Sequence, residues 1–468
     1  MSNFCKTCYS VLVWIGMAFM VSSLISCGDD DGDDGPLLSK RKEITSFELE
    51  GGCLGGNVTG DINGDNFTVR ATVPFGTDVT TLAPMIGISQ EASVQPTSET
   101  PQDFTTPVVY TVTAEDGTTQ DWTVIITVAG EDSQPVLTLS SAVWALTTFQ
   151  GTLPDWFTSN GEDGIAYGND HVYASFNHDQ IKFLDPANGD SRGDLDMTGV
   201  DGGSLKISDV ETSADGSILA CNVVDHNGNG TATFKIYRWA SETSAPQVYL
   251  EYEVSDVVRL GDNLSVIGDV TGDAVIYTAY GRNFSAGQRG ADVYRWEVTG
   301  GTLNETPTII RSSDFGLSGL GSRAHATALS VDDDVVWVNG NDVDVATLSL
   351  TDGSIQQQLP NENRDLVDFF YNNFVVFNLC DRTVIASVFP RSANESRLLV
   401  IDVTNGLDNV TADEVIYSED FVQGNTTDNA DASGNVTYNK VSESEAEVYI
   451  LITNQALAKF RLTLEAGS

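Results

Sequence analysis

The sequence predicts an all-β fold in which an N-terminal β-sandwich is followed by a six-bladed β-propeller. In residues 43–130, short segments alternate apolar and polar residues as half-buried strands do, and no helical period is present. Turns rich in Gly, Pro and Asp separate these segments. In residues 136–468, strand-like segments recur at a nearly constant interval, which is typical of a propeller.

The chain begins with a secretory signal that ends at a cysteine. Lys6 gives a weakly positive start, and an apolar run from residue 11 to residue 25 follows. Leu24-Ile25-Ser26-Cys27 resembles a bacterial lipobox, where signal peptidase II cuts and the cysteine is lipidated. A plain signal or a membrane-spanning anchor is the alternative, but the run is shorter than the roughly 20 residues that cross a bilayer. We therefore expect a lipoprotein signal peptide over residues 1–26 and lipid on Cys27.

Residues 27–42 are expected to form a flexible, lipid-anchored tether. Asp and Gly dominate the segment after Cys27 as far as Gly35, and nothing in it could bury a core. This acidic run resembles the export signal of surface-displayed lipoproteins in Bacteroidota. The resemblance implies a protein that is held in the outer membrane through Cys27 and exposed at the cell surface, with the periplasmic face of that membrane as the alternative.

The net charge limits the partners that the protein can have. The 468 residues include 67 acidic and 23 basic residues, which gives a formal charge of −44. Such a charge opposes binding to nucleic acid or to anionic lipid surfaces, so no nucleic-acid partner is expected. It favours neutral or cationic ligands and divalent metals. Solubility is an equally simple explanation, because the acidic residues are spread over many loops.

Three cysteines remain once the signal is removed and Cys27 is lipidated. Cys53, Cys221 and Cys380 are odd in number, far apart in sequence and without metal-ligand spacing. We therefore expect no disulfide framework. Cys221 and Cys380 lie among apolar strand residues, which favours a role as small core side chains.

The β-sandwich is expected over residues 43–130, with Trp122 in its core. The stretches 103–117 and 122–124 resemble an immunoglobulin-like (Ig-like) domain that is common in Bacteroidota surface lipoproteins. That resemblance implies a spacer or presentation role and no catalytic residues. The polar segment 131–135 is the expected linker. Four segments carry the strand pattern, namely residues 44–50, 67–73, 108–113 and 122–128.

The propeller is predicted over residues 136–468 from six related segments, each followed by a polar turn. Their central residues lie 53 to 59 positions apart, and another β-like run precedes each of the last five. A period near 50 residues, with about four strands in each unit, is typical of a β-propeller. The six segments are residues 181–185, 234–239, 293–297, 346–350, 399–403 and 458–462.

Six segments predict six blades, with seven blades or two separate sandwiches as alternatives. The last unit ends near Leu464, after its third strand. We expect residues 135–140 or 143–147 to supply its missing outer strand, because an unpaired edge inside a ring leaves backbone groups unsatisfied. Trp239 and Trp296 occupy equivalent repeat positions and are expected to pack inside the blades.

Two loops carry the aromatic and basic residues that we expect to bind a ligand. Trp156 lies in a segment without a strand pattern, where an exposed ring could stack on the apolar face of a sugar. The second loop begins at Tyr280, itself a candidate, and carries Arg282, Phe284 and Arg289. Two arginines in so acidic a chain could bind an anionic or hydroxyl-rich ligand. A long hairpin within a blade is the alternative.

Arg323 and His325 are candidates because they stand at the entry to a strand that could line the central channel. As a pair they could transfer a proton or bind an anion, and a polar channel lining is the alternative. No complete catalytic motif accompanies them, so the catalytic residues are unknown and an enzyme is not favoured.

Calcium is the one ion that the sequence offers a site for, although no cofactor is required. Asp225, Asn227 and Asn229 match the first half of a calcium-binding loop. Ile236 stands where such a loop needs a bidentate Glu. An Asn/Gly hairpin turn is the alternative.

These features predict a non-catalytic outer-membrane surface lipoprotein that presents its propeller for ligand capture. The layout resembles accessory lipoproteins of polysaccharide-uptake systems, which implies glycan binding and neighbouring surface or importer proteins as partners. A protein–protein adhesion or scaffold module is the second prediction. A propeller-type glycoside hydrolase or polysaccharide lyase is the third, and the presence of only four histidines argues against it.

Overall fold

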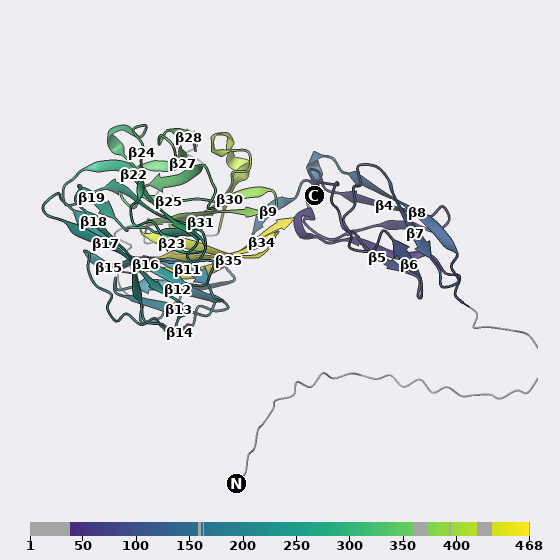
Figure 1. The fold of residues 1–468 in the computed structure, drawn as a ribbon, viewed down its shortest axis with the longest axis horizontal. Helices are drawn as coiled ribbons and strands as arrows, with labels where there is room; N and C mark the ends of the chain where they lie inside the picture. The colour runs from purple at the N-terminus through teal and green to yellow at the C-terminus, as the bar shows by residue number, and fades with distance from the viewer. Residues whose placement is uncertain are drawn as a thin grey trace, which may run out of the picture.

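The computed structural model describes residues 38–157, 161, 163–359, 373–392, 395–418 and 433–467. The predicted signal peptide, Cys27 and most of the tether lie outside the described residues. An N-terminal domain and a larger C-terminal ring of sheets stand side by side (Figure 1). No helix in the described part is long and apolar enough to cross a membrane. The helical turns are η1 (Gly52–Leu54), η2 (Glu131–Ser133), η3 (Gly316–Ser318), η5 (Leu407–Asn409) and η6 (Ala412–Glu414).

The N-terminal domain consists of two sheets that share one apolar core. One sheet has the order β2 (Val58–Thr59), β1 (Ile44–Leu49), β5 (Met85–Ile88). The other has the order β3 (Asp61–Asn63), β4 (Thr68–Val73), β8 (Thr119–Val128), β7 (Val108–Thr113), β6 (Ser93–Gln95). The pair β4 and β8 is parallel, whereas the other neighbours are antiparallel. The four strands predicted from alternation are confirmed as β1, β4, β7 and β8.

Trp122 lies in the core of this domain, as predicted. Its side chain is 1 % exposed and packs in one cluster with Phe47 and Tyr110. The indole Nε1 donates a hydrogen bond to the carbonyl oxygen of Lys42 at 3.0 Å, so the only polar atom of the side chain is satisfied.

The remaining described residues form six sheets, numbered here in chain order, whose strands follow one another along the chain. Sheet 1 is β11 (Ile165–Gly168), β12 (His171–Phe176), β13 (Gln180–Leu184), β14 (Ser191–Asp194); sheet 2 is β15 (Leu205–Thr212), β16 (Ile218–His226), β17 (Ala232–Trp239), β18 (Gln247–Val254), with β19 (Val258–Leu260) paired to β16. Sheet 3 is β20 (Ser265–Gly268), β21 (Ala274–Arg282), β22 (Arg289–Thr299), β23 (Thr302–Leu303), with β24 (Thr308–Arg311) paired to β22; sheet 4 is β25 (His325–Thr327), β26 (Val335–Gly340), β27 (Val343–Ser349), β28 (Ile355–Gln358). Sheet 5 is β29 (Phe374–Leu379), β30 (Arg382–Ser392), β31 (Glu395–Asp402), β32 (Val415–Tyr417); sheet 6 is β33 (Gly434–Ser442), β34 (Glu445–Ile452), β35 (Ala456–Glu465), β10 (Trp144–Thr147), with β9 (Val136–Leu139) paired to β35.

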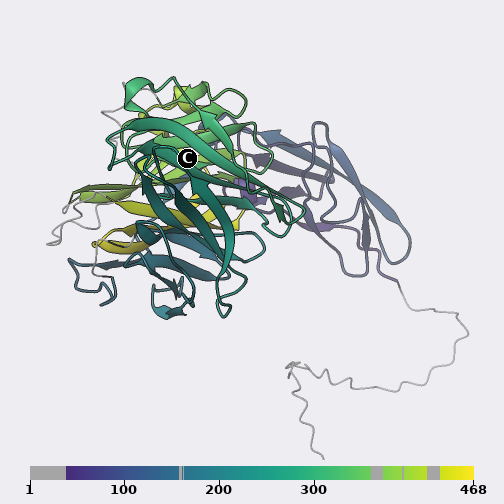
Figure 2. The ribbon, with the colours of Figure 1, turned by 60° about the vertical axis from the view of Figure 1, so that its left-hand side comes forward.

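The six sheets are arranged in a ring (Figure 2). The first strand of each sheet contacts the first strand of the next, and β11 of sheet 1 also contacts β33 of sheet 6. Each repeat segment read from the sequence lies in the third strand of its sheet, which confirms that the segments are equivalent. The first strands therefore surround the middle of the ring.

The last sheet is completed by the segment that follows the linker. β10 pairs with β35 from Trp144 opposite Lys459 to Thr147 opposite Ala456. β9 pairs with the far end of β35, where Leu139 stands opposite Leu462. The prediction that one of these two segments closes sheet 6 is confirmed, and both contribute.

Trp239 and Trp296 pack between neighbouring sheets, as their equivalent repeat positions predict. Both side chains are fully buried. Trp239 belongs to the cluster that joins sheets 1 and 2, and Trp296 stacks on Phe234 of sheet 2 at a centroid distance of 5.7 Å. These contacts supply the apolar area that holds adjacent sheets together.

The prediction of no disulfide is wrong, because Cys53 and Cys380 are bonded to each other. Their Cα atoms lie 5.4 Å apart although 327 positions separate them in sequence. Cys53 is on η1 of the N-terminal domain, and Cys380 is in the turn between β29 and β30, so the bond links the two parts of the molecule. Cys221 is fully buried among apolar side chains, as predicted.

Backbone contacts reinforce this link between the two parts. The Ala466 amide donates to the carbonyl oxygen of Gly55 at 2.8 Å. Gly55 has a left-handed φ of 71°, and a Cβ there would lie 2.4 Å from the Ala466 nitrogen, so only glycine fits. The Arg382 guanidinium donates to the carbonyl oxygen of Pro135 at 2.9 Å. The linker is thereby fastened to sheet 5.

Replacing Cys53 and Cys380 together by serine is expected to lower the free energy of unfolding by about 2 kcal/mol, because the unfolded chain regains the freedom that the cross-link removes. The Gly55 and Arg382 contacts remain, which limits the loss. Thermal unfolding with and without dithiothreitol measures it. The reductant should lower the Tm of the wild type and leave the double variant unchanged; identical behaviour of the two proteins would contradict the cross-link.

Candidate functional site

The antiparallel order of the strands assigns the loops of each sheet to two faces of the ring. Connections between successive sheets, and turns between second and third strands, lie at one face, called the loop face below. Turns between first and second strands lie at the opposite face. Cys380 is in such a turn, so the N-terminal domain is attached at the opposite face. Among the described residues, the N-terminal domain therefore leaves the loop face uncovered.

A cavity of about 380 Å³ opens at the loop face. Sheets 1 to 4 and their connections contribute to it. Most of its side chains are charged or polar, and Phe284 adds an aromatic ring. This loop-face cavity is lined by Asp163, His178, Leu205, Ser208, Arg259, Asp262, Phe284, Ser322, Arg323 and Asn341.

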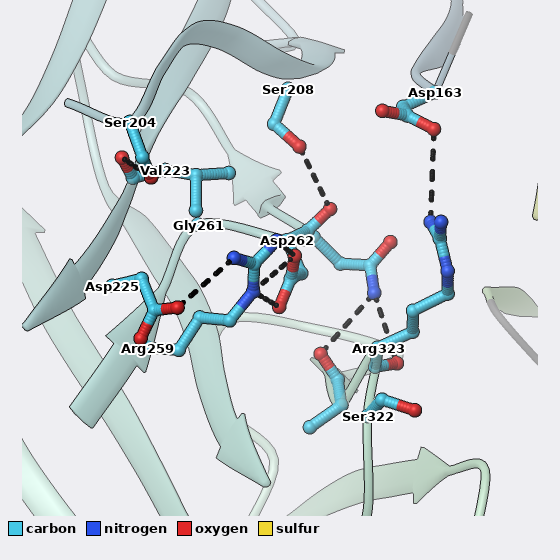
Figure 3. A network of polar contacts seen from close by, with 12 residues as sticks. Asp163, Ser204, Ser208, Val223, Asp225, Arg259, Gly261, Asp262, Ser322 and Arg323 are labelled. Carbon is cyan, nitrogen blue, oxygen red and sulfur yellow. Dashed lines mark hydrogen bonds and ion pairs between the residues drawn. The ribbon is translucent and has the colours of Figure 1, made fainter. Parts of the chain in front are cut away.

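Arg259 is the structural centre of the cavity wall (Figure 3). Its Nε donates to both carboxylate oxygens of Asp262 at 2.9 and 2.7 Å, and its Nη2 donates to Oδ1 at 2.6 Å. The Oδ2 of Asp225 lies 3.8 Å from its Nη1. Burial lowers the pKa of Arg259, but the charges of Asp262, Asp225 and Asp163 outweigh burial and raise it. The guanidinium therefore stays charged and holds two carboxylates in place.

Arg323 is held less tightly and keeps hydrogen-bonding capacity. Its Nη1 lies 3.7 Å from Oδ1 of Asp163, too far for a hydrogen bond (Figure 3). Its backbone has a left-handed φ of 54° and is fixed by Asn263, whose Nδ2 donates to the Arg323 carbonyl oxygen at 3.1 Å. In the described part of the chain the Arg323 guanidinium makes no hydrogen bond, so its donors can reach a ligand.

Asn283 positions Phe284 at the rim of the cavity. The buried Asn283 amide donates to the carbonyl oxygens of His226 and Val258 at 2.8 and 2.9 Å. Its Oδ1 accepts from the Ala286 amide at 2.5 Å, which closes the turn between β21 and β22. Phe284 follows directly and is 51 % exposed. The hydrogen bonds of Asn283 thus hold the loop in one conformation, in which the Phe284 ring is exposed to solvent.

The two arginines of this loop take different positions. The Cζ of Arg282 lies 5.1 Å from the centre of the Phe284 ring, and the Cζ of Arg259 lies at the same distance. Arg289 forms an ion pair with Asp342 and borders a separate open groove. That groove and the loop-face cavity share Asn341. The predicted loop therefore contributes to two adjoining hollows of one face.

Trp156 and Tyr280 are placed differently from the other candidates. The half-buried Trp156 ring packs against Phe157 and Phe176 at centroid distances of 5.5 and 5.3 Å. Tyr280 is 5 % exposed and belongs to the apolar cluster of sheets 2 and 3. Neither side chain lines the loop-face cavity. We assign Tyr280 to the core, and glycan stacking on Trp156 stays a prediction.

The predicted calcium ligands are engaged with the protein. Asp225 lies beside the Arg259 guanidinium and accepts a hydrogen bond from Ser285 at 3.0 Å. The Asn227 Oδ1 accepts from the Asn229 amide at 3.1 Å, as in a hairpin turn. Within the described residues, no group of three or more His, Cys, Asp or Glu side chains could hold a metal ion. Calcium at this loop stays a prediction from sequence.

A second cavity, of about 320 Å³, opens inside the ring toward the opposite face. We call it the channel cavity. His325 lines it, whereas Arg323 lines the loop-face cavity, so the structure separates the two residues that the sequence paired. Burial lowers the pKa of His325 to about 3, which keeps the ring neutral. The lining of the channel cavity comes from all six first strands or the residues beside them. It consists of Tyr167, Glu211, Thr212, Ser265–Gly268, His325, Thr327–Leu329, Asn373–Val376 and Thr437–Lys440.

Glu211 is the acidic group of the channel cavity. No nitrogen of Lys, Arg or His lies within 4.0 Å of its carboxylate in the described part of the chain. Lys440, which lines the same cavity, pairs with Glu443 at 2.6 Å instead. Burial and then the charge of Asp209 raise the pKa of Glu211 well above 4.5. Its ionised form is therefore disfavoured in the folded protein.

Replacing Glu211 by glutamine is expected to raise the free energy of unfolding at pH 8 above that of the wild type. The folded chain holds this proton more tightly than the unfolded chain, so the wild type loses stability as the pH rises above 4.5. The gain of the variant should thus vanish near pH 4. Urea unfolding at the two pH values measures it, with the exposed Glu253→Gln as control; equal gains at both pH values would contradict the shift.

Sequence reasoning missed the carboxylates and the second arginine of the loop-face cavity. Asp163 and Asp262 lie in connections before first strands, where acidic residues abound, and Arg259 lies on the short strand β19 just before Asp262. Their positions relative to the repeat are the signal that could have found them. Asp163 precedes β11 and Asp262 precedes β20 by a few residues, and the connections before first strands meet at one face of the ring.

The fold and the cavity together define a class of protein. A two-sheet domain carries a ring of antiparallel sheets, and the free face of the ring holds an open polar cavity with one exposed aromatic side chain. Cavities of this kind bind small polar molecules or segments of larger ones.

Residues 44–126 match the family model described as SGBP, N-terminal, which is the N-terminal domain of surface glycan-binding proteins. Residues 167–360 match a domain of unknown function, DUF8500. No curated protein matches the chain. The N-terminal match supports a protein of the Bacteroidota that works at the cell surface or outside the cell.

A solved structure shares the fold at low sequence identity, and a second is less similar. A DUF4623 family protein from Bacteroides eggerthii is 16 % identical, with a TM-score of 0.53 over 91 % of this chain and 99 % of that one. The WD40 β-propeller domain of Doa1 is 9 % identical, with a TM-score of 0.38 over 89 % of this chain and 97 % of that one. The likeness to the Bacteroides protein shows that the all-β architecture as a whole has a solved counterpart.

Proposed function

We propose that the protein is a non-catalytic, lipid-anchored surface protein that captures a glycan in its loop-face cavity. The observation that carries the proposal is the arrangement of the half-exposed Phe284 ring with the Arg323 donors in one cavity. A pyranose ring has an apolar face that stacks on an aromatic side chain, and its hydroxyl groups accept from guanidinium and donate to carboxylate. Asp163 and Asp262 supply such acceptors.

The proposed layout assigns one task to each part of the chain. A lipid on Cys27 holds the protein in the outer membrane, residues 27–42 are the tether, and an Ig-like domain over residues 43–130 is the spacer. The linker 131–135 leads into a six-bladed propeller over residues 136–468. The closed succession of six sheets supports this blade number, and the common core of two sheets supports the spacer domain.

The attachment of the N-terminal domain supports presentation of the loop face. The disulfide and the contacts of Gly55 and Arg382 fix that domain at the opposite face. A tether on the N-terminal domain would then leave the loop-face cavity open to the medium. Handing a captured polysaccharide to a neighbouring importer requires such an open site.

Affinity gel electrophoresis against algal, plant and microbial polysaccharides tests the proposal. The chain from Gly28 onward should be retarded by at least one of them, and the same samples should show no new reducing ends or unsaturated products. Retardation with products would make the protein an enzyme. Absence of retardation across the panel would overturn glycan capture and favour a protein partner.

A further inference from the structure

The channel cavity contains polar atoms that no protein group satisfies. Asn373 is 1 % exposed, and its Oδ1 has no hydrogen-bond partner in the described part of the chain. His325 is 2 % exposed, and its Nδ1 likewise has none there, while its Nε2 lies 3.5 Å from the Ser265 hydroxyl. Buried polar atoms are normally paired, so unpaired atoms on residues that line a cavity mark a place where an occupant could supply the missing hydrogen bonds.

The deficit at Asn373 and Glu211 is one of donors and of positive charge beside their oxygens. The Asn373 Oδ1 and the Glu211 carboxylate accept hydrogen bonds, and the Glu211 carboxylate has no cation within ion-pair distance among the described residues. Glu211 is partly exposed in the cavity, and an ionised carboxylate that is partly shielded from water is disfavoured when it has no cation beside it. An occupant with N–H donors and a positive charge would give the Asn373 Oδ1 a hydrogen-bond donor and the Glu211 carboxylate a cation.

The rest of the lining limits the occupant to a small polar organic molecule. Thr212, Thr327 and Thr437 bring hydroxyl groups, and Tyr167 and Tyr438 bring aromatic rings. A volume of about 320 Å³ is far larger than a metal ion needs and suits one ring-sized molecule. Aromatic rings beside a carboxylate are a recurrent setting for ammonium groups.

We propose that the channel cavity is a second binding site, separate from the loop-face cavity, for a small polar molecule that carries a protonated amine, of the amino-sugar type. Its ammonium group pairs with Glu211 and donates to the Asn373 Oδ1. The threonine hydroxyl groups and Ser265 bind the polar remainder of the molecule. The Nε2 of the neutral His325 imidazole faces the Ser265 hydroxyl, so its Nδ1 is left to form one hydrogen bond with a hydroxyl group of the ligand.

Titration calorimetry at pH 7 with the chain from Gly28 onward tests this site. The probes are D-glucosamine and its neutral counterparts D-glucose and N-acetyl-D-glucosamine, with sodium chloride held constant. Glucosamine should bind at least tenfold more tightly than either neutral sugar and should raise the Tm by about 2 °C at saturating concentration. Equal binding of the three sugars, or no binding of glucosamine, would overturn the proposal.

Variants locate the binding. Glu211→Gln should reduce glucosamine affinity at least tenfold, and this variant is expected to fold because it removes an uncompensated charge. Glu253→Gln, an exposed position on β18, should bind as the wild type does. The Phe284→Ala, Arg323→Ala variant should also bind glucosamine normally, which separates this site from the loop-face cavity. Unchanged affinity in Glu211→Gln would contradict the assignment even if glucosamine binds the wild type.

Discussion

Replacing Phe284 and Arg323 together by alanine is expected to weaken binding of a retarding polysaccharide by about 30-fold. Truncating a side chain that contacts a ligand commonly costs about 1 kcal/mol or more, so the two truncations together cost about 2 kcal/mol, which corresponds to about 30-fold in affinity. Phe284 loses the ring that would stack on the sugar, and Arg323 loses donors that the protein itself leaves unused. The dissociation constant from affinity gels of graded polysaccharide concentration measures the effect.

Substituting the same two residue types outside the loop-face cavity shows whether a loss of polysaccharide affinity is specific to that cavity. Phe149 is 61 % exposed and outside the lining of the cavity, and Arg192 is half-exposed on sheet 1. The Phe149→Ala, Arg192→Ala variant removes the same side-chain types and should bind normally. Both variants should unfold at the wild-type Tm within a degree or two. Equal affinity of the two variants would contradict a site at Phe284 and Arg323.

Replacing Arg259 by methionine is expected to lower the free energy of unfolding by about 3 kcal/mol. Methionine keeps much of the length and the apolar stem of the side chain but removes the charge. The carboxylates of Asp225 and Asp262, which are only 12 % and 13 % exposed, then lose their cation. Breaking a buried pair on one side leaves an uncompensated charge, which is costly. Urea unfolding at pH 8 measures the loss.

The control for this prediction is a surface pair of the same chemistry. Arg192 pairs with Asp185 on sheet 1, and its side chain is 51 % exposed. Exposed pairs contribute about 0 to 1 kcal/mol, so Arg192→Met should be nearly neutral. If Arg259→Met proves as mild as the control, the Arg259 network does not hold the cavity wall together.

The succession of sheets was readable from the sequence because each repeat buries its third strand between two others. Tyr237, Tyr294 and Leu348 are apolar for that reason and recur at nearly the period of the sheets. The closing strand was predictable by the same logic, since β35 without β10 would leave an open edge. Short strands such as β2 and β23, with two residues each, carry too little pattern to be found.

The disulfide was not predictable, because it depends on how two separately patterned domains meet. Cys53 is in a helical turn of one domain and Cys380 in a hairpin turn of another, and neither position shows a spacing signal. Three cysteines can form at most one disulfide with each other. It could not indicate which pair the docking of the domains would bring within 5.4 Å.

The site was predictable in part. Phe284, Arg282 and Arg323 were found because aromatic and basic residues are conspicuous in the loops of an acidic chain, and Phe284 and Arg323 line the loop-face cavity. Tyr280 was included with them, yet it lies on β21 with its side chain in the core, since strand residues alternate between two faces. Asp163 and Asp262 could not be distinguished from the other acidic residues, 67 in all, by sequence alone. They stand out only in the folded ring, where the connections that carry them lie at one cavity.

The most direct test of glycan capture at the loop face is a crystal structure of the chain with an oligosaccharide cut from a polysaccharide that retards it. The account predicts sugar density against the Phe284 ring, with hydroxyl groups within hydrogen-bond distance of the Arg323 guanidinium and of Asp163 or Asp262. Density confined to the N-terminal domain, to the channel cavity or to the outer strands of the ring would contradict it.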